Sequence, residues 1–255
     1  MKIRLNKNKN IGSVVFVVEG DVGELDIIKK IFNKIFKYEI VNYDKRKDEI
    51  YQFKSPKNKY SKVFVVPAKY SAVSKLDIDD EYFNNTFAKL IYYGLDIDNY
   101  PIYFLFDRDR VSNRPGAIEE NMKKYSNSRD NGLTRNGLFL LSYPSIEAFT
   151  CSCYKKDISF SNPKELKSFI IKEDIDINNI DEENILGAGS YLINQIKDII
   201  GKELSINDLD SFSENNLKIF DYQEKRFGRE KTYLILSLLL IACLDLGLID
   251  LIESK

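Results

Sequence analysis

The chain has 255 residues, enough to bury one substantial core but too few for two large domains. Charged residues make up 30% of it and hydrophobic residues 44%, which is typical of ordered globular proteins, and the formal net charge of −1 excludes a broad electrostatic attraction to nucleic acid. Histidine is absent, which excludes histidine-ligated zinc, histidine general bases and nucleophiles activated by histidine. Carboxylates gathered together would instead favour a hard cation such as Mg²⁺.

The first half of the chain alternates between predicted strands and helices. Continuous apolar runs predict buried strands over residues 13–18, 62–67, 101–106 and 137–143. Apolar residues at helical spacing predict helices over residues 24–36, 79–95 and, more weakly, 116–125. The charged stretch 42–61 is interpreted as a loop or a short excursion. This alternation predicts an α/β fold with a mostly parallel, Rossmann-like sheet flanked by helices.

Beyond about residue 155 the pattern becomes helical. We expect helices over residues 163–172, 191–200 and 232–252, with residues 187–190 as a helix start signal. The apolar run 234–244 is too short to span a bilayer, which needs roughly 20 residues, so we expect a buried or subunit-interface helix. The organisation is therefore predicted as a domain over 11–150 and a helical extension over 151–255 for dimerisation or partner binding.

The cysteines do not predict a disulfide framework. Cys151 and Cys153 are spaced C-x-C, and Cys243 stands alone. Small packed residues are favoured for the pair over a redox or metal role. With no signal peptide evident at the start, we expect a reducing, cytoplasmic location and no membrane association.

Acidic residues follow the predicted strands. Glu19 follows the first strand, Asp107 and Asp109 follow the third, and Glu147 comes a turn after the fourth. Ligands of open parallel sheets bind at this carboxyl edge, because loops and helix starts converge there. Acidic side chains placed so near one another repel each other unless a divalent cation relieves the repulsion. An extended backbone puts Asp107 and Asp109 on one side, so the sequence predicts a metal site.

The strand with Val17-Val18-Glu19-Gly20 and the later strand with Asp107-Arg108-Asp109 resemble the Toprim domain. Topoisomerases, bacterial primases, recombination proteins and the overcoming-lysogenization-defect (OLD) nucleases share this domain. The segment 143–149 is similar to a motif of small stand-alone Toprim proteins of anti-phage defence islands, including the RloB-like group. The resemblance covers roughly residues 11 to 150. It implies that Glu19, Asp107 and Asp109 bind Mg²⁺ and that Glu147 is a further catalytic acid.

One position departs from the OLD-type pattern, which often places a second acid four residues after the first glutamate. Here that position is Gly23, flanked by Asp21 and Glu24. Either acid is a candidate ligand for a second metal, and the sequence leaves the choice open. Gly20 fits a sharp turn with space for a phosphate near the following helix start.

The resemblance implies a nuclease dependent on Mg²⁺ or Mn²⁺ that cleaves DNA or RNA, as an effector of anti-phage defence. Arg108, Arg110 and Arg114 are the nearest candidates for phosphate contacts. Because no P-loop is visible, an OLD-like system would need a separate ATPase as partner. We also expect a homo-oligomer, with the tail from Thr232 as the candidate dimer surface.

Several alternatives stay open. Glu19 could cap the next helix, Asp107 and Asp109 could pair with nearby arginines, and Glu147 could be an ordinary helix residue. The domain could also be a catalytically weak module that senses a nucleotide or a partner. A receiver-like fold is a third alternative, but it requires a lysine at a later strand end, and residues 142–144 offer none.

Overall fold

The computed structural model describes residues 2–20, 23–42, 50–68, 80–96, 100–111, 113–129, 136–210 and 212–252. At the centre of the sheet lie four parallel strands, in the order β7-β6-β2-β5. Their bounds are Ser13–Val18 for β2, Lys62–Pro67 for β5, Ile102–Asp107 for β6 and Leu138–Tyr143 for β7. These four strands confirm the predicted runs to within a residue at each end.

The parallel strands form because both faces of the sheet are covered. Every residue of β2 and β7 is buried, and β-branched and aromatic side chains dominate the four strands. The register aligns their carboxyl ends, with Val18 opposite Leu105 and Asp107 opposite Ser142. Residues that follow β2, β6 and β7 therefore meet along one edge.

Antiparallel strands extend the sheet on both sides. Next to β7 lies β10 (Leu236–Ser237), and next to β5 lie β4 (Tyr51–Lys54) and then β3 (Glu39–Asn42). The fold is thus an α/β fold with a mixed central sheet. Of the stretch 42–61, predicted to be a loop or a short excursion, residues 51–54 form strand β4 and not a loop, because β4 pairs with β3 and β5 despite the charged surroundings, whereas residues 43–49 lie outside the described residues.

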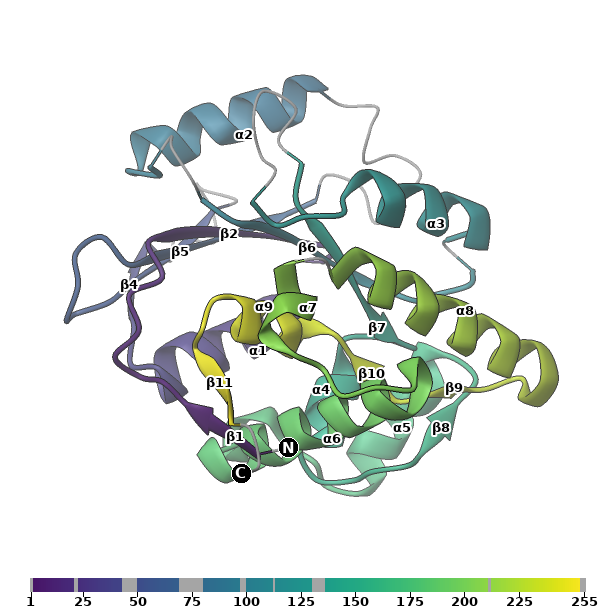
Figure 1. The fold of residues 1–255 in the computed structure, drawn as a ribbon. Helices are drawn as coiled ribbons and strands as arrows, with labels where there is room; N and C mark the ends of the chain where they lie inside the picture. The colour runs from purple at the N-terminus through teal and green to yellow at the C-terminus, as the bar shows by residue number, and fades with distance from the viewer. Residues whose placement is uncertain are drawn as a thin grey trace.

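Helices cover both faces of the sheet (Figure 1). The helices between the parallel strands are α1 (Gly23–Lys29), its continuation η1 (Lys30–Ile35), α2 (Asp80–Tyr92) and α3 (Pro115–Lys124), and α4 (Glu147–Ser152) follows β7. Figure 1 shows α2 and α3 over one face, and α1, α4, α6 and α9 on the other. The predicted helices over 24–36, 79–95 and 116–125 are confirmed, with small shifts of their ends.

The rest of the chain is helical with short strands between the helices. Its helices are α5 (Pro163–Lys172), η3 (Ile177–Asn179), α6 (Glu182–Ile200), α7 (Ile206–Asp210), α8 (Phe212–Glu230) and α9 (Leu239–Asp245). Two small antiparallel ribbons pair β8 (Ser159–Phe160) with β9 (Tyr233–Leu234), and β1 (Lys2–Leu5) with β11 (Ile249–Ile252). The first and last described residues therefore lie side by side (Figure 1).

Two helix predictions in this region are wrong. Residues 232–252 do not form one helix, because β9, β10 and β11 use parts of this stretch and only α9 is helical. The helix predicted from residue 191 begins at Glu182, and residues 187–190 lie inside it rather than at its start. Helix α8 was missed, because buried polar residues, Asn215, Asn216 and Gln223, interrupt its apolar repeat.

The predicted segments 11–150 and 151–255 share one sheet and one core. Strand β10 pairs with β7, and the main buried cluster contains side chains from both segments. The apolar run 234–244 is buried within the single chain, so its composition gives no support to a subunit interface there. None of the helices that the structure describes has the length and apolarity needed to cross a bilayer.

Candidate functional site

Glu19 and Asp107 meet at the carboxyl ends of the neighbouring strands β2 and β6. The main-chain N–H of Glu19 donates to the carbonyl of Leu105 at 3.1 Å, which continues the ladder past β2. The N–H of Asp107 in turn donates to Oε2 of Glu19 at 2.7 Å. The parallel register thus brings together two acids that are 88 residues apart in sequence.

The turn after β7 adds a third contribution. The Tyr143–Pro144 peptide bond is cis, and the N–H of Ile146 donates to Oδ1 of Asp107 at 2.7 Å. Helix α4 begins at Glu147, whose Oε2 accepts a hydrogen bond from Oγ of Ser145 at 2.6 Å. The motif predicted from the sequence around Glu147 therefore lies directly beside Asp107.

Glu24 joins the group from the first turn of α1. Its side chain is buried, and a Cβ atom placed on Gly20 would lie 3.0 Å from Oε2 of Glu24. A Cβ on Gly23 would lie 3.6 Å from Oε1 of Glu147. The two glycines therefore leave room for carboxylates. Of the two candidates for a further ligand, Glu24 lies in the group, and Asp21 lies outside the described residues.

Asp109 lies in the turn that follows β6. Its Oδ1 accepts a hydrogen bond from the N–H of Val111 at 3.0 Å, and its carbonyl accepts one from the N–H of Asn113 at 3.0 Å. Its charge raises the pKa of Glu19, so the two carboxylates interact electrostatically. We name Glu19, Glu24, Asp107, Asp109 and Glu147 together the acid cluster.

Burial and mutual repulsion shape the electrostatics of the acid cluster. Burial, opposed by the hydrogen bond from Asp107 and reinforced by the charges of Glu24 and Asp109, raises the pKa of Glu19 to about 7. Burial and the charges of Glu24, Glu19 and Glu147 raise the pKa of Asp107 well above its ordinary value. Burial and the Glu147 carboxylate also raise the pKa of Glu24. Without a cation, these carboxylates are therefore costly to keep ionised together.

One lysine that the sequence did not predict lies against the acid cluster. Nζ of Lys167 in α5 lies 3.1 Å from Oε1 of Glu147. Burial opposes its charge, but the carboxylates of Glu147, Asp107 and Glu24 outweigh burial and raise the pKa of Lys167. No local signal separates Lys167 from other lysines on α5, because only the packing of α5 against α4 brings it to this edge.

Arg108 does not contact solvent and cannot reach a phosphate in this conformation. Its side chain has no exposed surface, and its Nε donates to Oε1 of Glu224 in α8 at 2.7 Å. Its prediction as a phosphate contact is therefore wrong for the folded chain. The physical reason is the alternation of an extended backbone, which directs Arg108 away from Asp107 and Asp109.

The other two arginine candidates are accessible. Arg110 is partly exposed, and its Nη1 lies 2.9 Å from Oε2 of Glu224. Its guanidinium also lies over the ring of Phe227, 4.5 Å from the centroid. Arg114 is exposed just before α3. Both stay candidates for phosphate contacts.

The acids share an edge without forming a ready-made metal centre. Within the described ranges, no three histidine, cysteine, aspartate or glutamate side chains are arranged to hold a metal ion. The carboxylates instead accept hydrogen bonds from main-chain N–H groups, Ser145 and Lys167. A cation that bound several of them would need side chains such as Glu147 to turn away from these partners.

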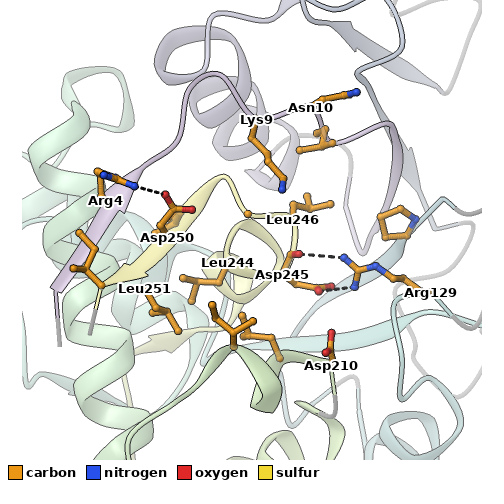
Figure 2. Close-up of a pocket in the computed structure, with 17 residues that line it drawn as sticks. Arg4, Lys9, Asn10, Arg129, Asp210, Leu244, Asp245, Leu246, Asp250 and Leu251 are labelled. Atoms are coloured by element: carbon orange, nitrogen blue, oxygen red, sulfur yellow. Dashed lines mark hydrogen bonds and ion pairs between the residues drawn. The ribbon is translucent and has the colours of Figure 1, made fainter. Parts of the chain in front are cut away.

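A pocket of about 760 Å³ lies elsewhere, near the amino ends of β2 and β6, and is lined in part by Ile11 and Pro101 (Figure 2). Its charged residues largely neutralise one another. Arg4 pairs with Asp250 at 3.0 Å, and Arg129 pairs with Asp245 at 2.5 Å. We therefore regard the acid cluster as the candidate site, because burial and mutual repulsion raise the pKa values of Glu19, Glu24 and Asp107 there.

The cysteines lie apart from this chemistry. All three are free and buried. Burial raises the pKa of the Cys151 thiol to about 11 and that of Cys243 to about 12. Thiols that stay protonated and buried are poor nucleophiles and ligands, which supports the prediction of packed small residues.

Comparisons of the chain with protein-family models, with curated proteins and with solved structures find no match. The class of the protein therefore rests on its own geometry. It is an α/β protein with a mixed central sheet and a cluster of partly buried acids at the carboxyl edge of its parallel strands.

Proposed function

We propose that this chain is a Mg²⁺-dependent nuclease that cleaves phosphodiester bonds in DNA or RNA. One observation carries the proposal: acids that follow β2, β6 and β7 meet at one edge of the parallel sheet, where burial and repulsion raise the pKa values of Glu19, Glu24 and Asp107. Perturbed groups gathered at a ligand-binding edge are typical of functional sites. Their resemblance to a Toprim site supports the same function.

The donor set fits a hard cation. All its members offer carboxylate oxygens, and Lys167 is the cation that the structure brings against them in the described part of the chain. Among the described residues, these carboxylates outnumber the lysine that lies against them. Glu19, Asp107 and Asp109 would hold the ion, with Glu24 or Glu147 as a further ligand.

Residues of the chain would perform the remaining tasks. A bound magnesium ion supplies Lewis-acid stabilisation of the phosphate and lowers the pKa of a bound water. Lys167 lies where it can neutralise a phosphate oxygen once Glu147 turns toward the ion. Arg110 and Arg114 would contact the nucleic-acid backbone. Since the net charge is −1, such contacts have to be local.

The biological setting belongs to the same proposal. The Toprim resemblance favours an OLD-like or RloB-like effector of anti-phage defence, located in the cytoplasm. It also favours a homo-oligomer and a separate ATPase as regulatory partner. The alternative is a catalytically weak Toprim-like module that senses a nucleotide or a partner.

A cleavage and binding experiment tests the proposal. The purified chain is incubated with Mg²⁺ or Mn²⁺ and a panel of plasmid, single-stranded DNA and transfer RNA. Calorimetry measures Mn²⁺ binding by the same protein. Glu19→Gln and Asp107→Asn should abolish cleavage and weaken Mn²⁺ binding. Asp250→Asn, which breaks an exposed ion pair far from the edge, should change neither.

The possible outcomes separate the two candidate functions. Cleavage that requires the metal and Glu19 supports the nuclease. Metal binding that requires Glu19, without cleavage of any substrate, would favour the sensor module. If wild-type protein binds no Mn²⁺, the metal site itself is refuted.

A further inference from the structure

Arg108 separates the two acids of the D-x-D motif and faces the opposite way. Its guanidinium is completely buried and lies near two aromatic rings, 5.7 Å from the centroid of Phe220 and 5.8 Å from that of Tyr233. A buried cation is costly unless it is paired with an anion. The anion is Glu224, which α8 supplies.

Glu224 is the centre of a small network. One oxygen, Oε1, accepts from Nε of Arg108 at 2.7 Å and from the hydroxyl of Tyr233 at 2.8 Å. The other oxygen accepts from Nη1 of Arg110 at 2.9 Å. The preceding residue, Gln223, donates from Nε2 to the carbonyl of Leu234 at 3.0 Å, and its Oε1 accepts from the main-chain N–H of Leu234. Helix α8 is therefore fixed to β9 at the level of Glu224.

The network also reaches the turn that holds Asp109. Nη1 of Arg108 donates to the carbonyl of Asn113 at 3.0 Å. The N–H of Asn113 donates to the carbonyl of Asp109. Asn113 therefore connects the guanidinium of Arg108 to Asp109 at the start of this turn. On the other side, the N–H of Arg108 donates to Ser142 in β7 at 2.8 Å. Arg108 thus connects β7, α8 and Asn113 on the two sides of the turn that follows Asp107.

We propose that Arg108 and Glu224 are positioning residues for the acid cluster, through which α8 holds Asp107 and Asp109 in place to bind the metal. This inference rests on the proposed function, because it concerns the same site. Glu224 touches none of the acids and acts only through Arg108 and the turn. Partners of this kind typically change metal affinity about 10- to 100-fold when they are replaced.

The test uses the full chain and compares two substitutions on α8. Glu224→Gln keeps the size of the side chain and an oxygen for Arg108 but removes the charge. Glu230→Gln is the matched control, because Glu230 forms an exposed ion pair with Arg226 on the same helix, at 2.6 Å. Tyr233→Phe removes one donor to Glu224 and leaves the aromatic ring, so it serves as a milder variant.

Two quantities are measured for each variant. Calorimetry gives the Mn²⁺ dissociation constant, and amide hydrogen exchange without metal gives the opening of residues 107–113. We expect Glu224→Gln to weaken Mn²⁺ binding about tenfold and to speed exchange in this turn. We expect a smaller change of the same sign for Tyr233→Phe and none for Glu230→Gln.

The outcomes distinguish this inference from the proposed function. If the wild type binds Mn²⁺ and both Glu224→Gln and Tyr233→Phe bind it equally well, α8 does not position the site and only the inference fails. If Glu224→Gln does not fold, Tyr233→Phe decides by itself. If wild-type protein binds no Mn²⁺, the proposed function fails, and the inference fails with it.

Discussion

At the scale of single residues, the surroundings of a carboxyl group decide its chemistry. Asp208 lies near the surface, where hydrogen bonds from Lys202 and Ser205 lower its pKa to about 2. Asp107 is the same type of residue, but burial and three neighbouring glutamates shift its pKa in the opposite direction. The acid cluster is therefore set apart by burial and by the mutual repulsion of its carboxylates, and not by its residue types.

The pKa of Glu19 predicts how the stability of the metal-free protein depends on pH. Its pKa rises from 4.5 to about 7 on folding, so the folded chain binds this proton more tightly than the unfolded chain. Its contribution is therefore most favourable below about pH 4.5 and is lost as the pH rises through about 7. Glu19→Gln should match the wild type at low pH and exceed it in stability at high pH.

Urea unfolding in the presence of a chelator measures this difference across the pH range. Mg²⁺ should reduce it, because a bound cation stabilises the ionised form of Glu19. A wild type that gains stability relative to Glu19→Gln as the pH rises would contradict the electrostatic account of the site.

The space beside Gly20 gives a second prediction at this scale. A Cβ atom in Gly20→Ala would lie 3.0 Å from Oε2 of Glu24, so the carboxylate has to move. We expect about tenfold weaker Mn²⁺ binding with little loss of stability. Calorimetry and thermal unfolding measure the two quantities.

Gly187→Ala is the control for Gly20→Ala. Gly187 lies inside α6 with no atom near its potential Cβ, so alanine should add about 0.5–1 kcal/mol of stability there. Its metal affinity should stay unchanged. Equal metal affinity in both variants would show that Glu24 does not take part in metal binding.

At the scale of elements, helix α6 shows how a helix start is fixed. The side chain of Asp181 accepts from the N–H of Asn184 at 2.9 Å, and the side chain of Asn184 accepts from the N–H of Asp181 at 3.0 Å. This capping box satisfies N–H groups that the helix leaves unpaired. The glycines at 187 and 189 then lie within the helix, where Gly189 lets it approach Ile3 of β1.

Asp181→Ala should therefore destabilise the protein by about 1 kcal/mol. Urea unfolding measures this loss, and Mn²⁺ binding should not change, because the cap does not contact the acid cluster. Asp198→Ala removes an exposed acid of the same helix beyond its first turn and should not destabilise it. Equal effects of the two substitutions would show that the capping box contributes nothing measurable.

At the scale of the whole molecule, the end of the chain completes structures that the beginning starts. Strand β11 pairs with β1, and β10 forms one edge of the central sheet beside β7. The intervening helix α9 contributes buried side chains throughout its length up to Leu244. The parallel sheet is therefore covered only when the last part of the chain is in place.

Removal of residues 231–255 should abolish cooperative folding. The deletion uncovers the edge of β7 and removes a continuous part of the core. Near-ultraviolet circular dichroism and thermal unfolding of the shortened chain measure the effect. A shortened chain with a sharp unfolding transition would show that residues up to 230 form an independent unit.

The amino-acid sequence predicted the parallel strands, the helices between them and the edge at which Glu19, Asp107 and Glu147 follow their strands. These features depend on local composition, which is visible in one sequence, and on the fixed geometry of parallel sheets. The tertiary structure decided the rest. Lys167 reaches the acids only because α5 packs on α4, and Arg108 is buried only because α8 supplies Glu224.

The last stretch of the chain shows the same limit. Its apolar residues are compatible with a helix or with buried strands, and only the available partners β7, β8 and β1 convert parts of it into β10, β9 and β11. The hydrogen bonds between strands join residues far apart in the chain, whereas the hydrogen bonds within a helix join residues close in sequence. Long-range contacts therefore decided the features that the local pattern left open.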